Sequence, residues 1–239
     1  MTLKLSTDLD IDRLRAAFAE RGRMRIPNVL TPDSAEALTE AMEAFDDWRI
    51  SVSAGGEVFE LPLKDRRAAD PDRQSWIDDV RIDGSSPRMQ YVFDTRRLTV
   101  EGMPDLTSDA VSQAPDFLNS AAFIAFVRGV TGDDRIDFAD AQATRYRPGH
   151  VLTTHSDEAA GKNRLYAYVL NLTRDWRADW GGALLFFDAR GDVVDGYVPA
   201  HNTLNLFRVP ENHAVAQIAS FSPRDRLSIT GWLRSRQAI

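Results

Sequence analysis

The sequence has no cysteine, only four histidines and no long apolar run. Without cysteine, the 239-residue chain can form no disulfide, thiolate zinc site or iron–sulfur cluster, and it has no cysteine nucleophile. No stretch approaches the roughly 18 uninterrupted apolar residues of a membrane helix, and the charged N-terminus lacks the apolar segment of a secretory signal. We therefore expect a soluble, cytoplasmic protein with no membrane partner.

Acidic residues outnumber basic ones, 36 against 29, which gives a formal charge of −7. A protein that binds nucleic acid needs a basic face to displace counterions from the phosphates. The composition therefore argues against a nucleic-acid partner. The length suits a single domain over residues 1–239 that buries its own core.

The first 135 residues are predicted to mix helices and strands. Apolar spacing predicts a helix over residues 10–21, a second that begins at Pro32 after the N-cap Thr31, and two more over residues 64–76 and 115–129. Short β-branched runs predict strands at residues 24–29 and 89–93 and a hairpin of residues 50–53 and 58–63.

From residue 136 onward, short segments rich in β-branched and aromatic residues alternate with turns. The predicted strands are 138–146, 151–155, 164–172, 183–187, 193–198, 204–209, 213–219 and 226–232. Such a series favours a sandwich or barrel, of which the jelly roll is one form. We expect a mainly β fold in which the helices of the first part support one sheet.

Two histidines and an aspartate in this second part have the spacing of metal ligands. His155 and Asp157 are two residues apart at a strand end, so their side chains project to the same side. His213 begins a later strand, which a β-barrel can bring opposite this pair. Two imidazoles and one carboxylate on one face of a metal are the ligand set of non-haem Fe(II) oxygenases. A lone His-x-Asp pair is more often a surface turn, so the pattern alone leaves both interpretations open.

Arg226 is unusual because it heads an otherwise apolar strand that ends at Trp232. A buried arginine is costly unless it meets an anion, and its planar guanidinium suits a carboxylate. The sequence alone allows either a structural ion pair with one of the 36 acidic residues or a site for an anionic ligand.

Residues 136–235 carry an ordered series of short motifs. They are Tyr146-x-Pro148-Gly149, His155-x-Asp157, Arg164, Leu172-x-x-x-Trp176, Gly181-Gly182-x-Leu184, Pro199, Leu206-Phe207, His213-x-Val215 and Arg226-x-x-Ile229-Thr230-Gly231-Trp232. The series resembles the Fe(II)/2-oxoglutarate-dependent dioxygenases of the prolyl 4-hydroxylase type, in particular the bacterial relatives of the oxygen-sensing prolyl hydroxylases. The resemblance implies a double-stranded β-helix (a cupin-like jelly roll) as the catalytic core at 136–235. Residues 1–135 would then support the core and form the substrate entrance.

The resemblance also implies a role for each matching residue. His155, Asp157 and His213 would bind Fe(II), and Arg226 would pair with the distal carboxylate of 2-oxoglutarate. Tyr146 would hydrogen-bond the cosubstrate or a metal-bound water, the alternative being a core tyrosine. Three residues match positions near the substrate or the metal, with plain core or solvated roles as alternatives: Arg164, Thr230 and Trp232.

The sequence departs from the family at Asn171, where many relatives have a tyrosine that assists the arginine. An amide can also donate to a carboxylate but reaches less far, so we expect cosubstrate binding to lose roughly 1 kcal/mol. Arg224 competes with Arg226 for the carboxylate role, although Arg226 fits the motif better. His150 and His201 do not fit the ligand set, and we expect them to be solvated or structural.

These residues predict an enzyme, a dioxygenase that uses 2-oxoglutarate and O2, releases succinate and CO2, and hydroxylates an unactivated C–H bond. Its cofactor would be Fe(II), with ascorbate as a supporting reductant. Because Asp157 fills the position that halogenases of the family leave open for chloride, hydroxylation is favoured over halogenation. The substrate stays open between a prolyl or other residue of a protein or peptide, a free amino acid and a natural product.

Two alternatives to this enzyme remain at the level of sequence. One is a non-catalytic β-barrel binding module whose histidines and aspartate are structural. The other is a cupin-type metal enzyme that needs no 2-oxoglutarate, for which Arg226 would have no role in activity.

Overall fold

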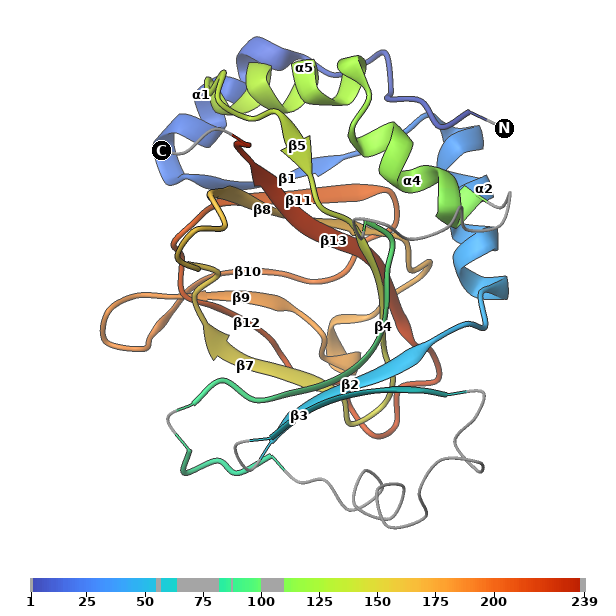
Figure 1. Ribbon diagram of the computed structural model, residues 1–239, viewed down its shortest axis with the longest axis vertical. Helices are drawn as coiled ribbons and strands as arrows, with labels where there is room; N and C mark the ends of the chain where they lie inside the picture. Colours follow the sequence, from blue (N-terminus) through green and yellow to red (C-terminus); the bar gives the residue numbers. More distant parts are fainter. Residues whose placement is uncertain (1, 55–56, 64–81, 87, 100–109, 237–239) are drawn as a thin grey trace.

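The computed structural model describes residues 2–54, 57–63, 82–86, 88–99 and 110–236 (Figure 1). The helices are α1 (Ile11–Arg21), α2 (Pro32–Ala44), α4 (Ala110–Leu118), α5 (Ala121–Thr131) and the short 3-10 helix η1 (Ala178–Trp180). The strands are β1 (Arg23–Pro27), β2 (Arg49–Ala54), β3 (Glu57–Pro62), β4 (Tyr91–Arg97), β5 (Phe138–Ala139), β6 (Gln142–Tyr146), β7 (Val151–His155), β8 (Arg164–Asn171), β9 (Leu184–Phe187), β10 (Val193–Tyr197), β11 (Thr203–Arg208), β12 (His213–Val215) and β13 (Arg226–Arg234).

The strands form one antiparallel sheet that folds back on itself. Its order is β1-β11-β8-β13-β6-β4-β7-β12-β9-β10, with β2, β3 and β5 attached beside this path. In Figure 1 the strands β8, β11 and β13 lie across the barrel from β7, β9 and β12. The predicted mainly β fold, a barrel-like sheet with supporting helices, is confirmed.

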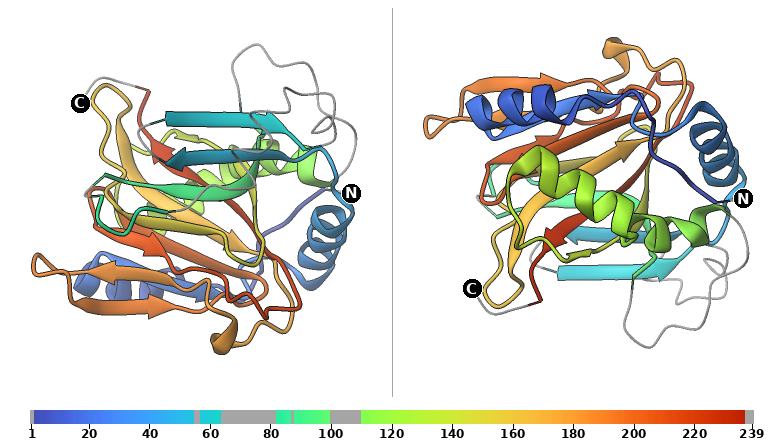
Figure 2. Two further views of the ribbon diagram at one scale, coloured as in Figure 1. Left: turned by 90° about the horizontal axis from the view of Figure 1, so that it is seen from below. Right: turned by 90° about the horizontal axis from the view of Figure 1, so that it is seen from above.

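The outer face of β8, β11 and β13 packs against helices. Leu170, Leu206 and Ile229 share one buried cluster with Phe18 of α1 and Phe123 of α5. Seen from above in Figure 2, α1, α4 and α5 lie in front of these strands and α2 stands at one edge. The helices therefore support one side of the sheet, as the sequence predicted.

The inner face of the same strands forms a second apolar cluster. Ala167 and Val169 of β8 pack there with Phe207 of β11 and with Leu184 and Phe186 of β9. Both faces of β8 are thus buried, which explains why its sequence is a nearly continuous apolar run rather than an alternating one.

Local signals in the first part predicted several elements well. Asp10 caps α1 by accepting a hydrogen bond from the backbone N–H of Arg13, and Gly22 ends the helix in the left-handed conformation. The predicted hairpin is the antiparallel pair of β2 and β3. The predicted helix at residues 64–76 lies outside the described residues.

The prediction of one helix over residues 115–129 is wrong, because α4 and α5 are separate. The Asn119 side chain donates to the carbonyl oxygens of Pro115 and Ala139, both at 2.9 Å. The hydroxyl of Ser120 accepts from the backbone N–H of Phe123 and starts α5 as its N-cap. These polar side chains bond the backbone locally, which ends one helix and begins the next.

Two further predicted strands differ from the structure. The segment 138–146 is divided into β5 and β6, and the segment 213–219 pairs as a strand only as far as Val215. β12 shifts register within its three residues, between His213 and Val215.

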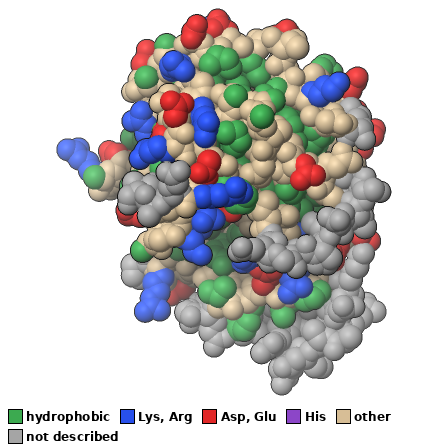
Figure 3. All heavy atoms as spheres, turned by 45° about the horizontal axis from the view of Figure 1, so that its top comes forward, with side chains coloured by type: hydrophobic (Ala, Val, Ile, Leu, Met, Phe, Trp, Pro, Cys, Tyr) green, Lys and Arg blue, Asp and Glu red, His purple; other side chains and the backbone are tan. Residues whose placement is uncertain are grey.

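Strands from both halves of the chain are hydrogen-bonded into the same sheet, since β1 pairs with β11 and β4 pairs with β6 and β7. The division at residue 136 into a supporting region and a catalytic core therefore stays a prediction. None of the described helices is long and apolar enough to cross a membrane. Acidic and basic side chains are interspersed on the face drawn in Figure 3.

Candidate active site

Strand pairing brings the three predicted metal ligands together. His155 ends β7, His213 begins β12, and the two residues are direct partners in the antiparallel ladder of these strands. Asp157 lies just beyond the end of β7. One ligand atom from each of the three residues lies within 4.8 Å of the other two.

The ligand atoms converge on one point. His155 Nε2 lies 3.6 Å from Asp157 Oδ1, and His213 Nε2 lies 3.4 Å from Asp157 Oδ2. The two imidazole centroids are 4.2 Å apart. Two nitrogens and a carboxylate on one side of a point fit a divalent metal that keeps open positions on its other side.

Backbone carbonyl groups orient both imidazoles and set the tautomer of the neutral rings. His155 Nδ1 lies 3.0 Å from the Thr153 oxygen, and His213 Nδ1 lies 2.8 Å from the Glu211 oxygen. A carbonyl oxygen only accepts, so each Nδ1 carries the hydrogen and each Nε2 presents a lone pair toward Asp157. Burial lowers the pKa of His213 to about 4, which keeps this imidazole neutral at neutral pH.

Aromatic rings surround His213 inside the barrel. The Phe207 ring centroid lies 4.6 Å from that of His213, and Phe186 lies 6.3 Å away. His213 is 5% exposed. The walls around this histidine are thus apolar and exclude water from one side of the ligand set.

Arg226 is the most unusual buried residue of the barrel. Its side chain is 1% exposed, and its Nε has no hydrogen-bond partner among the described residues. The guanidinium lies 5.2 Å from the ring centroid of Tyr146, its register partner on β6. Burial lowers the pKa of Arg226 from its ordinary value, but a guanidinium stays charged in proteins. No described carboxylate compensates this charge, so the arginine fits an anionic ligand better than a structural ion pair.

Tyr146 is the predicted neighbour of that anion. It is 3% exposed, and burial raises the pKa of its hydroxyl far above the ordinary value. The phenol is therefore neutral and can donate a hydrogen bond. The ring stacks on Phe93 of β4, at 5.1 Å between centroids, and this contact holds its orientation.

Asn171 lies on the same inner face, opposite Ser228 of β13 and Thr203 of β11. Its Nδ2 donates to the Thr203 hydroxyl at 3.1 Å, and its Oδ1 has no partner among the described residues. The Asn171 atom that has no partner, Oδ1, is therefore an acceptor. Direct donation from Asn171 to a carboxylate, as the sequence suggested, requires the amide to rotate by half a turn.

The three predicted substrate residues lie along β8 and β13. The Arg164 guanidinium stacks 3.4 Å from the Trp232 ring centroid, and its Nη1 donates to the Asp157 backbone oxygen at 3.0 Å. Thr230 accepts a hydrogen bond from Gln142 at 3.2 Å. Arg164 and Trp232 thus border the ligand set, and their contact with a substrate stays a prediction.

The two remaining histidines and Arg224 lie apart from the ligand set. His150 is 6% exposed and structural rather than solvated, and His201 shares a 2.9 Å hydrogen bond with Thr39. Arg224 precedes β13 and lines a cavity on the outer face of the barrel, with Leu227. Arg224 is outside the strand and exposed, whereas Arg226 is the first residue of β13 and is buried on the inner face.

Sequence reasoning missed Arg23 of β1. Its Nη1 bonds the Glu211 carboxylate at 2.5 Å and its Nε bonds that of Asp195 at 3.2 Å. Its guanidinium also lies 5.2 Å from the ring centroid of Phe186, the register partner of His213. An arginine in a short strand carries no local signal for such a role, because the contacts come from distant segments.

Comparisons with known proteins agree with this geometry. The family model of the 2OG-Fe(II) oxygenase superfamily matches residues 141–234, and this segment contains the three convergent ligands and Arg226. No curated protein matches the chain by sequence.

Solved structures resemble the whole chain. A prolyl-4-hydroxylase from Pseudomonas putida has a TM-score of 0.61 at 18% identity, with 95% of this chain and 99% of that chain covered. A 2OG-Fe(II) oxygenase family oxidoreductase from Burkholderia pseudomallei has a TM-score of 0.62 at 14% identity, with both chains fully covered (100%). A prolyl hydroxylase from Trichoplax adhaerens, in complex with a hypoxia inducible factor peptide fragment, has a TM-score of 0.59 at 16% identity, covering 94% and 89%. At these identities the likeness shows the shared fold.

Proposed function

We propose that this chain, whose residues 141–234 match the 2OG-Fe(II) oxygenase superfamily model, is a 2-oxoglutarate-dependent dioxygenase that hydroxylates an unactivated C–H bond. One observation carries the proposal: a barrel with three convergent metal-ligand atoms also buries Arg226 without an acidic partner among the described residues. A binding module, or a metal enzyme that uses no 2-oxoglutarate, gives no reason for this buried charge.

His155, Asp157 and His213 would hold the iron through two Nε2 atoms and a carboxylate oxygen. Bound Fe(II) supplies the activation of O2, which converts 2-oxoglutarate to succinate and CO2 and places the second oxygen atom in the substrate C–H bond. The Thr153 and Glu211 carbonyls keep the hydrogen on Nδ1 of each histidine, so both Nε2 lone pairs stay available. Asp157 would occupy a third ligand position, which would favour hydroxylation over halide transfer.

Arg226 would bind the distal carboxylate of 2-oxoglutarate as a bidentate partner, deep in the barrel where water competes least. The neutral hydroxyl of Tyr146 would donate to the same cosubstrate. Asn171 would complete the pocket either through a bridging water on Oδ1 or with its amide rotated. All three side chains are at most 3% exposed.

Arg164, Trp232 and Thr230 would face the substrate. Arg164 and Trp232 stack on one another beside Asp157, where a residue near the iron would pass. Solved relatives of this fold are described as prolyl hydroxylases, one of them with a bound peptide fragment. A prolyl residue in a peptide is therefore the first substrate to test, ahead of free amino acids and natural products. Ascorbate as a supporting reductant and a cytoplasmic location complete the proposal.

The test is turnover of candidate substrates with Fe(II), 2-oxoglutarate, ascorbate and O2. Succinate release and the gain of one oxygen atom in the substrate would be measured by mass spectrometry for prolyl peptides and free amino acids. The proposal expects equal amounts of succinate and hydroxylated product with a true substrate, and neither product with His155→Ala. Absence of succinate across the whole panel, with or without a substrate, would count against a dioxygenase.

A further inference from the structure

Asp94 of β4 is a fully buried carboxylate that bonds two arginines from the end of one strand. Its Oδ2 accepts hydrogen bonds from Arg145 Nε and Arg147 Nε, both at 2.8 Å, and its Oδ1 accepts from Arg147 Nη2 at 3.1 Å. The Asp94 side chain is 0% exposed. These three residues, which we call the Asp94 clamp, have no role in the proposed function.

The residue between the two arginines is Tyr146, the last residue of β6. Asp94 and Arg145 are direct partners in the ladder of β4 and β6, so their side chains lie on the same face of the sheet. Side chains alternate along a strand, so Tyr146 points to the opposite face, where it is the register partner of Arg226. The Asp94 clamp therefore holds the chain on both sides of a residue that would bind the cosubstrate.

Phe93, the neighbour of Asp94 in β4, contacts the same tyrosine on the inner face. Its ring stacks on that of Tyr146, with 5.1 Å between the centroids and 20° between the ring planes. Two consecutive residues of β4 thus support Tyr146, because Phe93 packs on its ring and Asp94 bonds the arginines that flank it. A side chain held by packing on one face and by hydrogen bonds on the other has a fixed direction.

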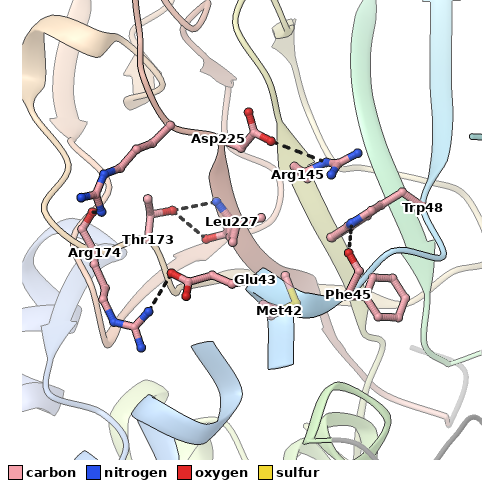
Figure 4. Close-up of a pocket in the computed structure, with 10 residues that line it drawn as sticks. Met42, Glu43, Phe45, Trp48, Arg145, Thr173, Arg174, Asp225 and Leu227 are labelled. Carbon is pink, nitrogen blue, oxygen red and sulfur yellow. Dashed lines mark hydrogen bonds and ion pairs between the residues drawn. The ribbon is translucent and has the colours of Figure 1, made fainter. Parts of the chain in front are cut away.

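Asp94 is the strongest partner of both arginines. Arg145 lines the cavity on the outer face of the barrel, where its guanidinium lies 5.0 Å from the Trp48 ring centroid and its Nε lies 3.9 Å from Asp225 Oδ2 (Figure 4). Both distances are long beside the 2.8 Å to Asp94. Among the described residues, the ion pairs of Arg147 are with Asp94 alone.

We propose that Asp94 is a positioning residue for the cosubstrate site. Through Arg145 and Arg147 it fixes the end of β6, and thereby the direction in which the Tyr146 hydroxyl points. Asp94 itself lies on the other face of the sheet and does not contact the cosubstrate. The inference rests on the proposed function in one respect, which is that Tyr146 donates a hydrogen bond to 2-oxoglutarate.

The first test is Arg147→Gln, which removes one arm of the Asp94 clamp while Arg145 still neutralises the buried carboxylate. With Mn(II) in place of iron, calorimetry should show 2-oxoglutarate binding weakened by about three- to tenfold, because a hydrogen bond to a charged ligand is partly lost. The affinity for Mn(II) should not change. Loss of both affinities, or of neither, would show that Arg147 has a general structural role or none.

Arg49→Gln is the matched control for this variant. The Arg49 side chain is 33% exposed, against 32% for Arg147, and its Nε bonds Glu60 at 2.9 Å in the hairpin beside β4. Both affinities should match those of the wild type. Asp94→Asn removes the charge that holds both arms, so it should weaken 2-oxoglutarate binding more than Arg147→Gln does. If Asp94→Asn does not fold, Arg147→Gln carries the test.

The second test is a double-mutant cycle with Tyr146→Phe, which keeps the ring but lacks the hydroxyl. If the Asp94 clamp acts through that hydroxyl, Arg147→Gln should cause no further loss of 2-oxoglutarate affinity in the Tyr146→Phe background. An equal loss in both backgrounds would overturn the proposal, because Arg147 would then act on binding by another route.

The third test needs neither metal nor cosubstrate. In the full chain labelled with 3-fluorotyrosine, the fluorine resonance of Tyr146 can be assigned as the one of five that Tyr146→Phe removes. This resonance should shift or broaden in Arg147→Gln and stay unchanged in Arg49→Gln. An unchanged resonance in Arg147→Gln would overturn the proposal. If the wild type binds no 2-oxoglutarate but the resonance responds as expected, the proposed function fails and the positioning of Tyr146 by Asp94 stands.

Discussion

His155 and His213 are direct partners across one antiparallel ladder, and their ring centroids lie 4.2 Å apart. Each ring is held from behind by a backbone carbonyl, so both histidines present Nε2 to the same carboxylate of Asp157. Strand pairing and two main-chain hydrogen bonds therefore hold the proposed ligand set in place.

Replacing Arg226 by Met should weaken 2-oxoglutarate binding without lowering the stability of the ligand-free protein. The variant lacks the guanidinium charge that would bind 2-oxoglutarate. The affinity of the protein for 2-oxoglutarate should therefore fall by at least about 30-fold, equivalent to about 2 kcal/mol. The ligand-free protein should be at least as stable as the wild type, because a buried charge without an acidic partner disappears and an apolar side chain takes its place. Binding would be followed by anaerobic titration and stability by urea denaturation. A large loss of stability in the ligand-free variant would mean that Arg226 has a structural partner.

Gly182→Ala should crowd the side chain of Arg226. A Cβ at Gly182 would lie 2.6 Å from Ile218 Cδ1 and 3.2 Å from Arg226 Cδ, and the backbone has a φ of +68°. We expect crowding to lower the free energy of unfolding by about 1–3 kcal/mol and to weaken 2-oxoglutarate binding.

Gly191→Ala is the matched control for this substitution. Gly191 has a φ of +89° but nothing within 4 Å of its Cβ position, so it measures the backbone strain alone. Gly191→Ala should leave 2-oxoglutarate binding unchanged. Equal losses of stability and affinity in the two variants would show that crowding against Arg226 does not matter.

Arg23→Gln should weaken metal binding from a distance. Arg23 bonds the Glu211 carboxylate, and the Glu211 backbone oxygen in turn accepts the hydrogen bond from His213 Nδ1. Arg23 also lies against the ring of Phe186, which packs near His213. Residues that orient a metal ligand typically contribute about 10- to 100-fold to affinity. We expect a loss of about tenfold in Mn(II) affinity, measured by calorimetry, with partial rescue by Arg23→Lys.

Arg21→Gln controls for the loss of an ion pair at the same edge. Arg21 is 56% exposed and bonds Asp195, which it shares with Arg23, whereas the Glu211 carboxylate pairs with Arg23. Its substitution should leave Mn(II) affinity unchanged. If Arg21→Gln and Arg23→Gln have the same effect, the contribution comes from Asp195 rather than from the support of His213.

His150 should make the protein lose stability in mild acid. Burial lowers the pKa of His150 to about 4, below the ordinary 6.5 that it regains on unfolding. As the pH falls from 6.5 toward 4, the unfolded chain therefore takes up this proton while the folded protein does not, and the folded state loses up to about 3 kcal/mol. Urea denaturation of wild type and His150→Gln between these pH values should show a smaller loss in the variant. Parallel pH profiles would contradict this assignment, and His201→Gln should change the profile less.

The sequence allowed the three convergent residues and the buried arginine to be singled out, because each follows from a local pattern. His155 and Asp157 share one side of a strand end, and Arg226 fits the motif that continues to Trp232 better than Arg224 does. The sequence alone does not predict which hydrogen bonds Asn171 makes, because its partner Thr203 comes from a strand that pairs with β8 only in the folded barrel. The support of His213 by Arg23 was hidden for the same reason.

The helices show a second limit. The apolar spacing of residues 115–129 continues through the break at Ser120, so periodicity alone joined two helices. The capping hydroxyl of Ser120 and the amide of Asn119 overrode that pattern. Two consecutive polar residues within a helical pattern of apolar residues indicate a helix break. How strongly they do so depends on partners such as the Ala139 carbonyl, which lies in a different segment.

The most direct test of the central claim is an anaerobic titration of the protein with Fe(II) and then 2-oxoglutarate, followed by visible absorption. We expect a weak charge-transfer band that appears only when both are present, is absent in His155→Ala, and needs far more 2-oxoglutarate in Arg226→Met. No band in the folded wild-type protein, or a band of equal affinity in Arg226→Met, would contradict it.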